Sequence, residues 1–212
     1  TGCTSSSDAI GYAARLIRHG EAQIVLTGGI EACITPGIMA GFDRMKVTST
    51  AFNETPERAS RPFNRDRDGF VLGEGAWVFV MESETSAQKR GARIYGTVSG
   101  YASTCDAYHR VMVEPSGEEA ARAMELALED ARLSTEEIDY INLHGTSTKM
   151  NDAMETNVIK KVFGGRARMI STSATKSMIG HPQGACGAAG VAASLWAFRE
   201  QKIPPTVNYE NP

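Results

Sequence analysis

Hydrophobic and polar residues follow one another in short blocks along this chain, and the blocks predict alternating helices and strands. Within residues 117–132 the apolar side chains recur at helical spacing, which is typical of an amphipathic helix. The short apolar run 22–27, which ends at Gly28-Gly29, is typical of a buried strand. Alternation of these two element types favours an α/β fold with a layered architecture.

The same patterns predict the remaining elements. We expect helices over 5–19, 36–45, 84–89, 152–163 and 182–201, and strands over 69–81, 94–103, 138–143 and 169–172. Residues 48–68 are polar and rich in turn-forming residues, so we expect a long surface loop there. Helix 182–201 is rich in alanine and glycine, which allow close packing, so we expect it to be buried between layers.

Composition and charge exclude several classes of protein. The chain has 212 residues, of which 42% are hydrophobic and 22% are charged, enough to bury a core. A formal net charge of −3 gives no general attraction to nucleic acids or anionic membranes. We find no apolar run of bilayer length and no basic-plus-apolar leader. We therefore expect a cytoplasmic protein that binds neither nucleic acid nor membrane.

The four cysteines are Cys3, Cys33, Cys105 and Cys186, and they form no CxxC pair. This spacing does not favour a zinc site, so we expect no metal and reduced thiols. We interpret Cys33, Cys105 and Cys186 as small buried hydrophobic residues.

Four residues stand where chemistry is expected in an α/β fold. Cys3 precedes a helix with a hydroxyl-rich first turn, whose free N–H groups favour a thiolate and lower the pKa of the thiol. His144 follows the predicted strand 138–143, and Lys176 and His181 precede the last predicted helix. Taken singly, each also fits an ordinary structural role. Together they form a set that can activate a thiol and polarise a thioester carbonyl.

Several ordered motifs accompany these residues. They are the Ser/Thr run after Cys3, RPF at 61–63, RDGFVLGEGA at 67–76, HGTST at 144–148, KSMIGH at 176–181 and IPPT at 203–206. With them the chain resembles the ketosynthases of dissociated fatty acid and polyketide synthesis, most of all the β-ketoacyl-acyl carrier protein synthase II group. The resemblance covers nearly the whole chain.

The resemblance implies a thiolase-like fold with layers in the order α-β-α-β-α. Members of the family are about twice as long as this chain. We therefore expect residues 1–212 to be one partial ketosynthase domain that lacks much of the N-terminal half and the C-terminal end, with no internal boundary. In the family two such chains form a homodimer.

The resemblance also implies the reaction and the role of each residue. Cys3 takes an acyl group from acyl carrier protein as a thioester. His144 and His181 hold the malonyl thioester carbonyl during decarboxylation, and Lys176 orders the network around them. Thr146, Thr148 and Phe70 are implied to bind substrate. No cofactor is expected, because phosphopantetheine arrives on the carrier protein.

Acyl carrier protein is acidic, so its docking surface on the ketosynthase is expected to be basic. Arg44, Lys46 and Arg58 lie in a basic stretch, and Lys46 falls near a docking position of the family. The other interpretation is a solvated loop whose basic side chains pair with Asp66 and Asp68. Exposed ion pairs of this kind contribute little to stability.

Three alternatives to fatty acid elongation remain open from the sequence. The same chemistry serves type II polyketide synthesis. A Cys/His pair also serves thioesterases and proteases, although a second histidine and Lys176 argue against this. A truncated, non-catalytic relative that only binds the carrier is the third alternative.

Overall fold

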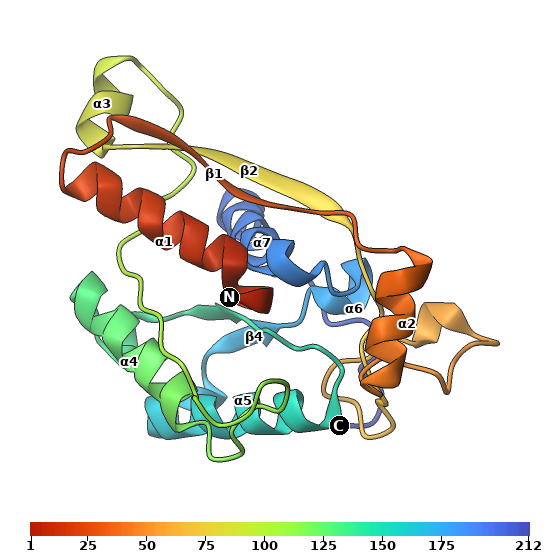
Figure 1. Cartoon of the computed structure of the whole chain (residues 1–212). Coiled ribbons are helices and arrows are strands. Elements are labelled where there is room, and N and C mark those ends of the chain that lie inside the picture. Colours follow the sequence, from red (N-terminus) through yellow and green to blue (C-terminus); the bar gives the residue numbers. More distant parts are fainter.

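The computed structural model describes residues 1–212 and shows a mixed α/β fold built in layers (Figure 1). One layer is the antiparallel sheet of β1 (Ile24–Glu31) and β2 (Gly75–Glu82). Helices α1 (Ser5–Arg18) and α7 (Cys186–Glu200) pack side by side beneath it. Below them lies the parallel pair of β3 (Tyr140–Asn142) and β4 (Ser171–Ser173).

Helices α4 (Glu118–Ala131) and α5 (Lys149–Phe163) form the outer layer next to β3 and β4 (Figure 1). Leu143 and Ile170, which flank the short strands, pack with Ile159 and Phe163 of α5 in a buried apolar cluster. This core supports the loops that leave β3 and β4.

The helices agree closely with the sequence pattern. Besides α1, α4, α5 and α7, the chain forms α2 (Pro36–Arg44) and α3 (Glu84–Lys89), as predicted, and a short α6 (Lys176–Ile179). The last helix begins later than predicted, because residues 183–185 form a separate 3₁₀ turn, η5 (Gln183–Ala185). None of the helices is long and apolar enough to cross a membrane.

The predicted strands need three corrections. Strand β1 does not end at Gly28-Gly29 but continues through them to Glu31. A Cβ atom on Gly28 would lie 2.0 Å from the Trp77 carbonyl oxygen, and one on Gly29 would lie 2.8 Å from the Ala185 Cα atom. The two glycines therefore permit close backbone contact within a strand rather than a turn.

The second correction concerns residues 69–81, of which only the part from Gly75 onward forms a regular strand. Phe70 and Leu72 instead form isolated bridges, to Thr48 and His181 respectively. Thirdly, residues 94–103 form no strand. Side chains from helices hold this segment: the Tyr101 N–H group donates to Asp130, and the Tyr101 hydroxyl donates to Asp8.

Burial differs from the prediction in three places. Arg61 and Asn64 are fully buried, although we expected a surface loop over 48–68. Cys105 is exposed, whereas Cys33 and Cys186 are buried as predicted. Helix α7 is buried at its start, but Trp196 and Phe198 near its end are 55% and 71% exposed.

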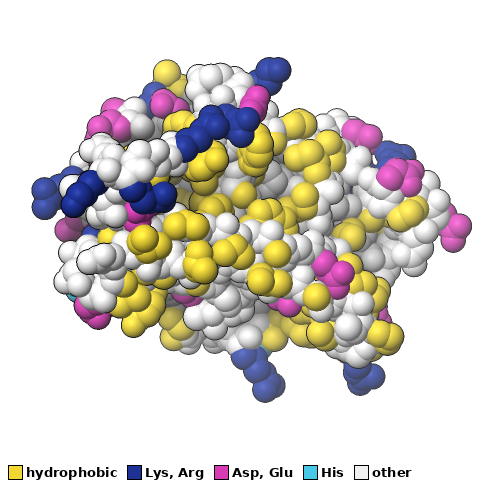
Figure 2. Space-filling model, turned by 90° about the horizontal axis from the view of Figure 1, so that it is seen from above, with side chains coloured by type: hydrophobic (Ala, Val, Ile, Leu, Met, Phe, Trp, Pro, Cys, Tyr) yellow, Lys and Arg dark blue, Asp and Glu magenta, His cyan; other side chains and the backbone are white.

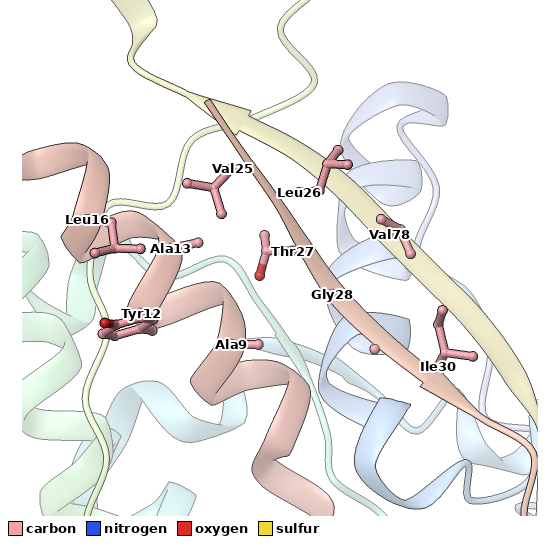
Figure 3. Close-up of a pocket in the computed structure, with 11 residues that line it drawn as sticks. Ala9, Tyr12, Ala13, Leu16, Val25, Leu26, Thr27, Gly28, Ile30 and Val78 are labelled. Carbon is pink, nitrogen blue, oxygen red and sulfur yellow. The ribbon is translucent and has the colours of Figure 1, made fainter. Parts of the chain in front are cut away.

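The outer face of the β1–β2 sheet is apolar and uncovered. Leu26, Ile30 and Val80 point outward and are 73%, 72% and 61% exposed, and hydrophobic side chains gather over this face (Figure 2). An open apolar groove of about 620 Å³ lies between α1 and β1, lined by Tyr12, Leu16 and Val25 among others (Figure 3). None of the residues that line it is one of the predicted catalytic residues.

Candidate active site

Three turns bring together the thiol and the two histidines singled out in the sequence. Cys3 lies in η1 (Gly2–Thr4), directly before α1, His144 follows β3, and His181 lies between α6 and η5. The Cys3 sulfur is 3.2 Å from Nε2 of His181, although 178 residues separate the two. The His144 and His181 rings meet edge to face, with centroids 5.4 Å apart. The sulfur and one nitrogen from each ring lie within 4.8 Å of one another.

The backbone of His181 is fixed by the RDGFVLGEGA segment. The His181 N–H group donates to the Val71 carbonyl at 2.7 Å, and the Gly73 N–H group donates to the His181 carbonyl at 3.1 Å. The Phe70 ring packs edge to face on the His181 ring, with centroids 5.2 Å apart. Phe70, predicted to bind substrate, therefore directly supports a histidine of the site.

Lys176 is buried beside the histidines but does not bond to either ring. Its Nζ atom donates to the backbone carbonyl of His144 at 2.6 Å. Burial, then the Lys176 charge, lowers the pKa of His181 to about 3. Burial, Lys176 and His181 together hold the pKa of His144 well below its usual range. Both imidazoles are therefore neutral at physiological pH, each with one N–H donor and one acceptor nitrogen.

The pKa of Cys3 differs from the prediction. Burial, and after it the neighbouring Cys186, raises the pKa of the Cys3 thiol to about 11, although Lys176 partly offsets the rise. The sequence predicted a lowered pKa from the start of helix α1, but removal of water from around the sulfur outweighs that effect. The resting pair is a neutral thiol beside a neutral imidazole.

The sequence analysis missed two buried acids of α5. Glu155 accepts hydrogen bonds from the N–H groups of His144 at 2.6 Å and Gly145 at 2.8 Å. Asp152 accepts from the Phe63 N–H group at 2.8 Å and lies 3.3 Å from Arg67. Burial raises the pKa of both carboxyl groups. Acids three positions apart lie on one face of a helix, and this spacing directly after HGTST was the available signal.

Thr146 and Thr148 lie close together on the loop after His144. Their hydroxyl oxygens are 2.9 Å apart, and Thr148 caps α5 by accepting from the Asn151 N–H group. Thr146 is buried and Thr148 is half-buried. Both hydroxyls therefore have partners within the loop, which holds its shape.

The basic stretch divides into internal and exposed members. The Arg61 side chain is fully buried beside Asp66, and Arg67 donates to the carbonyls of Thr148 and Lys149. Arg58 pairs with Glu210 at 2.9 Å. Arg44 and Lys46 are exposed and form no ion pair, so of the three predicted docking residues these two present unpaired charge.

The sequence led us to expect no metal. In the structure, the side chains of Cys3, His144 and His181 bring three potential metal-ligand atoms within 4.8 Å of one another. Thiolate and imidazole are ligands that zinc accepts. The Lys176 charge, which lowers the pKa of both histidines, also disfavours a bound cation at this place.

Comparison with known proteins assigns the fold and the family. Residues 1–87 match the model of the β-ketoacyl synthase N-terminal domain, and residues 95–210 match that of its C-terminal domain. The whole chain superposes on 52% of a chain in a solved complex, with a TM-score of 0.97 and 39% identity. That complex is a type II polyketide synthase acyl carrier protein with its ketosynthase, bound to the hexaketide. It also superposes on 50% of a β-ketoacyl synthase chain from Burkholderia phymatum, with a TM-score of 0.93 and 39% identity. The predicted thiolase-like fold is thereby confirmed.

Curated relatives match over the full length of the chain. It is 49% identical to 51% of the 3-oxoacyl-[acyl-carrier-protein] synthase 2 of Synechocystis, and 48% identical to 50% of the tetracenomycin polyketide synthase ketoacyl synthase alpha subunit of Streptomyces glaucescens. The chain thus spans about half the length of the curated relatives that it matches. By its sequence and its structure, this chain belongs to the β-ketoacyl synthase family.

Proposed function

We propose that the protein containing this chain is a β-ketoacyl-acyl carrier protein synthase that elongates acyl chains by decarboxylative condensation. The observation that carries the proposal is the Cys3 thiol, 3.2 Å from Nε2 of His181 and beside a second neutral histidine. A nucleophile next to a base, together with two N–H donors for a developing oxyanion, is the set that this chemistry requires.

In the first step the Cys3 sulfur attacks the thioester carbonyl of acyl carrier protein. The new bond joins the sulfur to the acyl carbon, and the bond from that carbon to the carrier sulfur breaks. His181 Nε2 takes the thiol proton and passes it to the departing carrier sulfur. Because the pKa of the thiol is about 11, the base acts during attack rather than before it.

In the second step malonyl-acyl carrier protein loses carbon dioxide, and the electron pair moves onto the thioester carbonyl as an enolate. The N–H group of His144 and that of His181, in the tautomer that carries its proton on Nε2, donate to that oxygen, where negative charge develops. The enolate carbon attacks the acyl-Cys3 carbonyl and the bond to Cys3 breaks. The sulfur returns to a thiol by taking a proton from solvent, which balances the loss of the malonyl carboxylate as carbon dioxide, and the β-ketoacyl product leaves two carbons longer. Phosphopantetheine arrives on the carrier, and no other cofactor is required.

The proposed partner is acyl carrier protein in its acyl and malonyl forms. The complex of a related ketosynthase with its acyl carrier protein supports this partner. Exposed Arg44 and Lys46 supply unpaired positive charge for an acidic carrier. We also propose that the full-length protein is a homodimer.

Type II polyketide synthesis is a second candidate for the pathway. It is favoured by the tetracenomycin relative, whose identity of 48% nearly equals the 49% of the 3-oxoacyl-[acyl-carrier-protein] synthase 2 relative. The two pathways share every chemical step above and differ in the acyl chain that is extended.

The test uses the full-length protein and mass mapping of Cys3. After incubation with acyl-acyl carrier protein we expect an acyl adduct on Cys3, which malonyl-acyl carrier protein converts into a product two carbons longer. Cys3→Ala abolishes the adduct, whereas Cys105→Ser, at an exposed cysteine, leaves it. Release of free acid alone would indicate a hydrolase, and absence of an adduct would indicate a non-catalytic relative.

A further inference from the structure

A glutamine lies against the nucleophile and has no role in the steps above. The Oε1 atom of Gln183 lies 3.7 Å from the Cys3 sulfur and accepts from the thiol when the proton does not point to His181 Nε2, 3.2 Å from the same sulfur. Gln183 is half-buried and begins the η5 turn before α7. The nucleophile is therefore contacted by two polar side chains, of which the mechanism uses one.

The other end of the Gln183 amide is an unused donor. Its Nε2 atom is inaccessible to solvent and has no hydrogen-bond partner. Buried donors without partners are rare, because a donor that is removed from water and forms no hydrogen bond in the protein destabilises the fold. A donor of this kind beside a nucleophile indicates that its acceptor arrives with the substrate.

The backbone holds this glutamine in an unfavourable conformation. Gln183 has a φ of +33°, a backbone angle that residues other than glycine rarely adopt. The two residues that follow Gln183 are held in place, because the Gly184 N–H group donates to Glu31 at 3.2 Å and the fully buried Ala185 packs on Gly29. Strain of this kind persists where the surroundings enforce it and is concentrated at functional sites.

We propose that the Gln183 Nε2–H group donates a hydrogen bond to the carbonyl oxygen of the acyl thioester on Cys3. This inference rests on the proposed function and adds a catalytic residue to it. Acylation joins the Cys3 sulfur to the acyl carbon and sends the thiol proton away with the carrier sulfur. The Oε1 atom then loses its donor, while the new carbonyl oxygen, two bonds from that sulfur, needs one. As charge grows on that oxygen in the transition state, the bond strengthens and speeds acyl transfer.

The experiment compares three variants of the full-length protein. Gln183→Leu removes the amide, Gln183→Glu keeps its shape but not the Nε2 donor, and Gln201→Leu is the matched control. Gln201 also has a positive φ, of 52°, but is exposed and lies at the far end of α7. Each protein is acylated from a carrier with a ¹³C-labelled acyl carbonyl. The rate is followed by intact mass, and the carbonyl stretch of the adduct is read by difference infrared spectroscopy.

We expect both Gln183 variants to acylate about tenfold more slowly, the effect of one lost hydrogen bond. The carbonyl band of their adducts should move to higher wavenumber, because the carbonyl oxygen has lost a hydrogen-bond donor. A slower rate caused only by misfolding would not produce this shift. Gln201→Leu should match the wild type in both rate and band. An unchanged band and rate in the Gln183 variants would overturn the inference. An adduct that malonyl-acyl carrier protein does not extend overturns only the proposed condensation, and a wild-type protein without adduct overturns both.

Discussion

Lys176 donates a 2.6 Å hydrogen bond from its buried Nζ atom to the backbone carbonyl of His144, rather than to either imidazole. The cation therefore holds the loop of one histidine and acts on both rings through its charge. That charge contributes to the lowered pKa of His144 and His181.

Lys176→Met is expected to raise the pKa of both histidines, because the positive charge that disfavours their protonation is removed. The same change raises the pKa of Cys3 further, since Lys176 partly offsets its rise. Histidine ring signals followed by NMR against pH measure the first effect. Lys202→Met, at an exposed position, is the control. Unchanged histidine titrations would contradict the electrostatic role assigned to Lys176.

Alkylation of Cys3 is expected to accelerate with pH over an unusually wide range. The thiolate is the reactive form, and burial raises the pKa of Cys3 to about 11. Labelling by iodoacetamide, mapped by mass, should therefore rise about tenfold per pH unit from neutrality to about pH 10. A plateau in the labelling rate near pH 8 would show that the N–H groups at the start of helix α1 lower the pKa of Cys3 by more than burial raises it.

Acid is expected to destabilise the protein through His181. The folded-state pKa is about 3, against an unfolded value near 6.5, so the unfolded chain binds more protons between these values. The contribution of His181 to stability is therefore complete above about pH 6.5 and is lost as pH falls toward about 3. Urea unfolding of wild type and His181→Gln at several pH values isolates this contribution. Parallel curves for the two proteins would contradict it.

Glu155→Gln is expected to lower the free energy of unfolding by about 1–3 kcal/mol, because it leaves a buried N–H group of the His144 loop without an acceptor. Chemical denaturation measures the loss. The control is Glu125→Gln, on the exposed side of α4, which should change stability by less than about 0.5 kcal/mol. Equal effects at the two positions would show that Glu155 does not support the loop.

Two Gly→Ala changes are expected to have opposite signs. A Cβ atom on Gly29 would meet the Ala185 backbone at 2.8 Å, so Gly29→Ala should displace η5 and cost about 1–3 kcal/mol. Gly37, in α2, has open space around it, and Gly37→Ala should stabilise by up to about 1 kcal/mol through helix propensity. Thermal unfolding compares them, and a tolerated Gly29→Ala would contradict the close contact described here.

Much of the architecture is visible in the sequence because it is encoded locally. Apolar residues at helical spacing predicted α1, α4 and α5 to within a few residues, since burial of one helix face imposes that period. The ordered motifs around Cys3, His144 and His181 sufficed to predict the family, because their residue types and order are specific.

The tertiary structure decided what depends on distant neighbours. Residues 94–103 have strand-like composition but find no strand to pair with, and Arg61 is buried because charged partners surround it. The rise in the pKa of Cys3 and the free donor of Gln183 likewise follow from which groups enclose the sulfur. By itself the sequence predicted the helices, the family and the residues expected to react. Desolvation and hydrogen-bond partners are contributed by segments far apart in the chain, so only the folded structure determined the protonation and support of those residues.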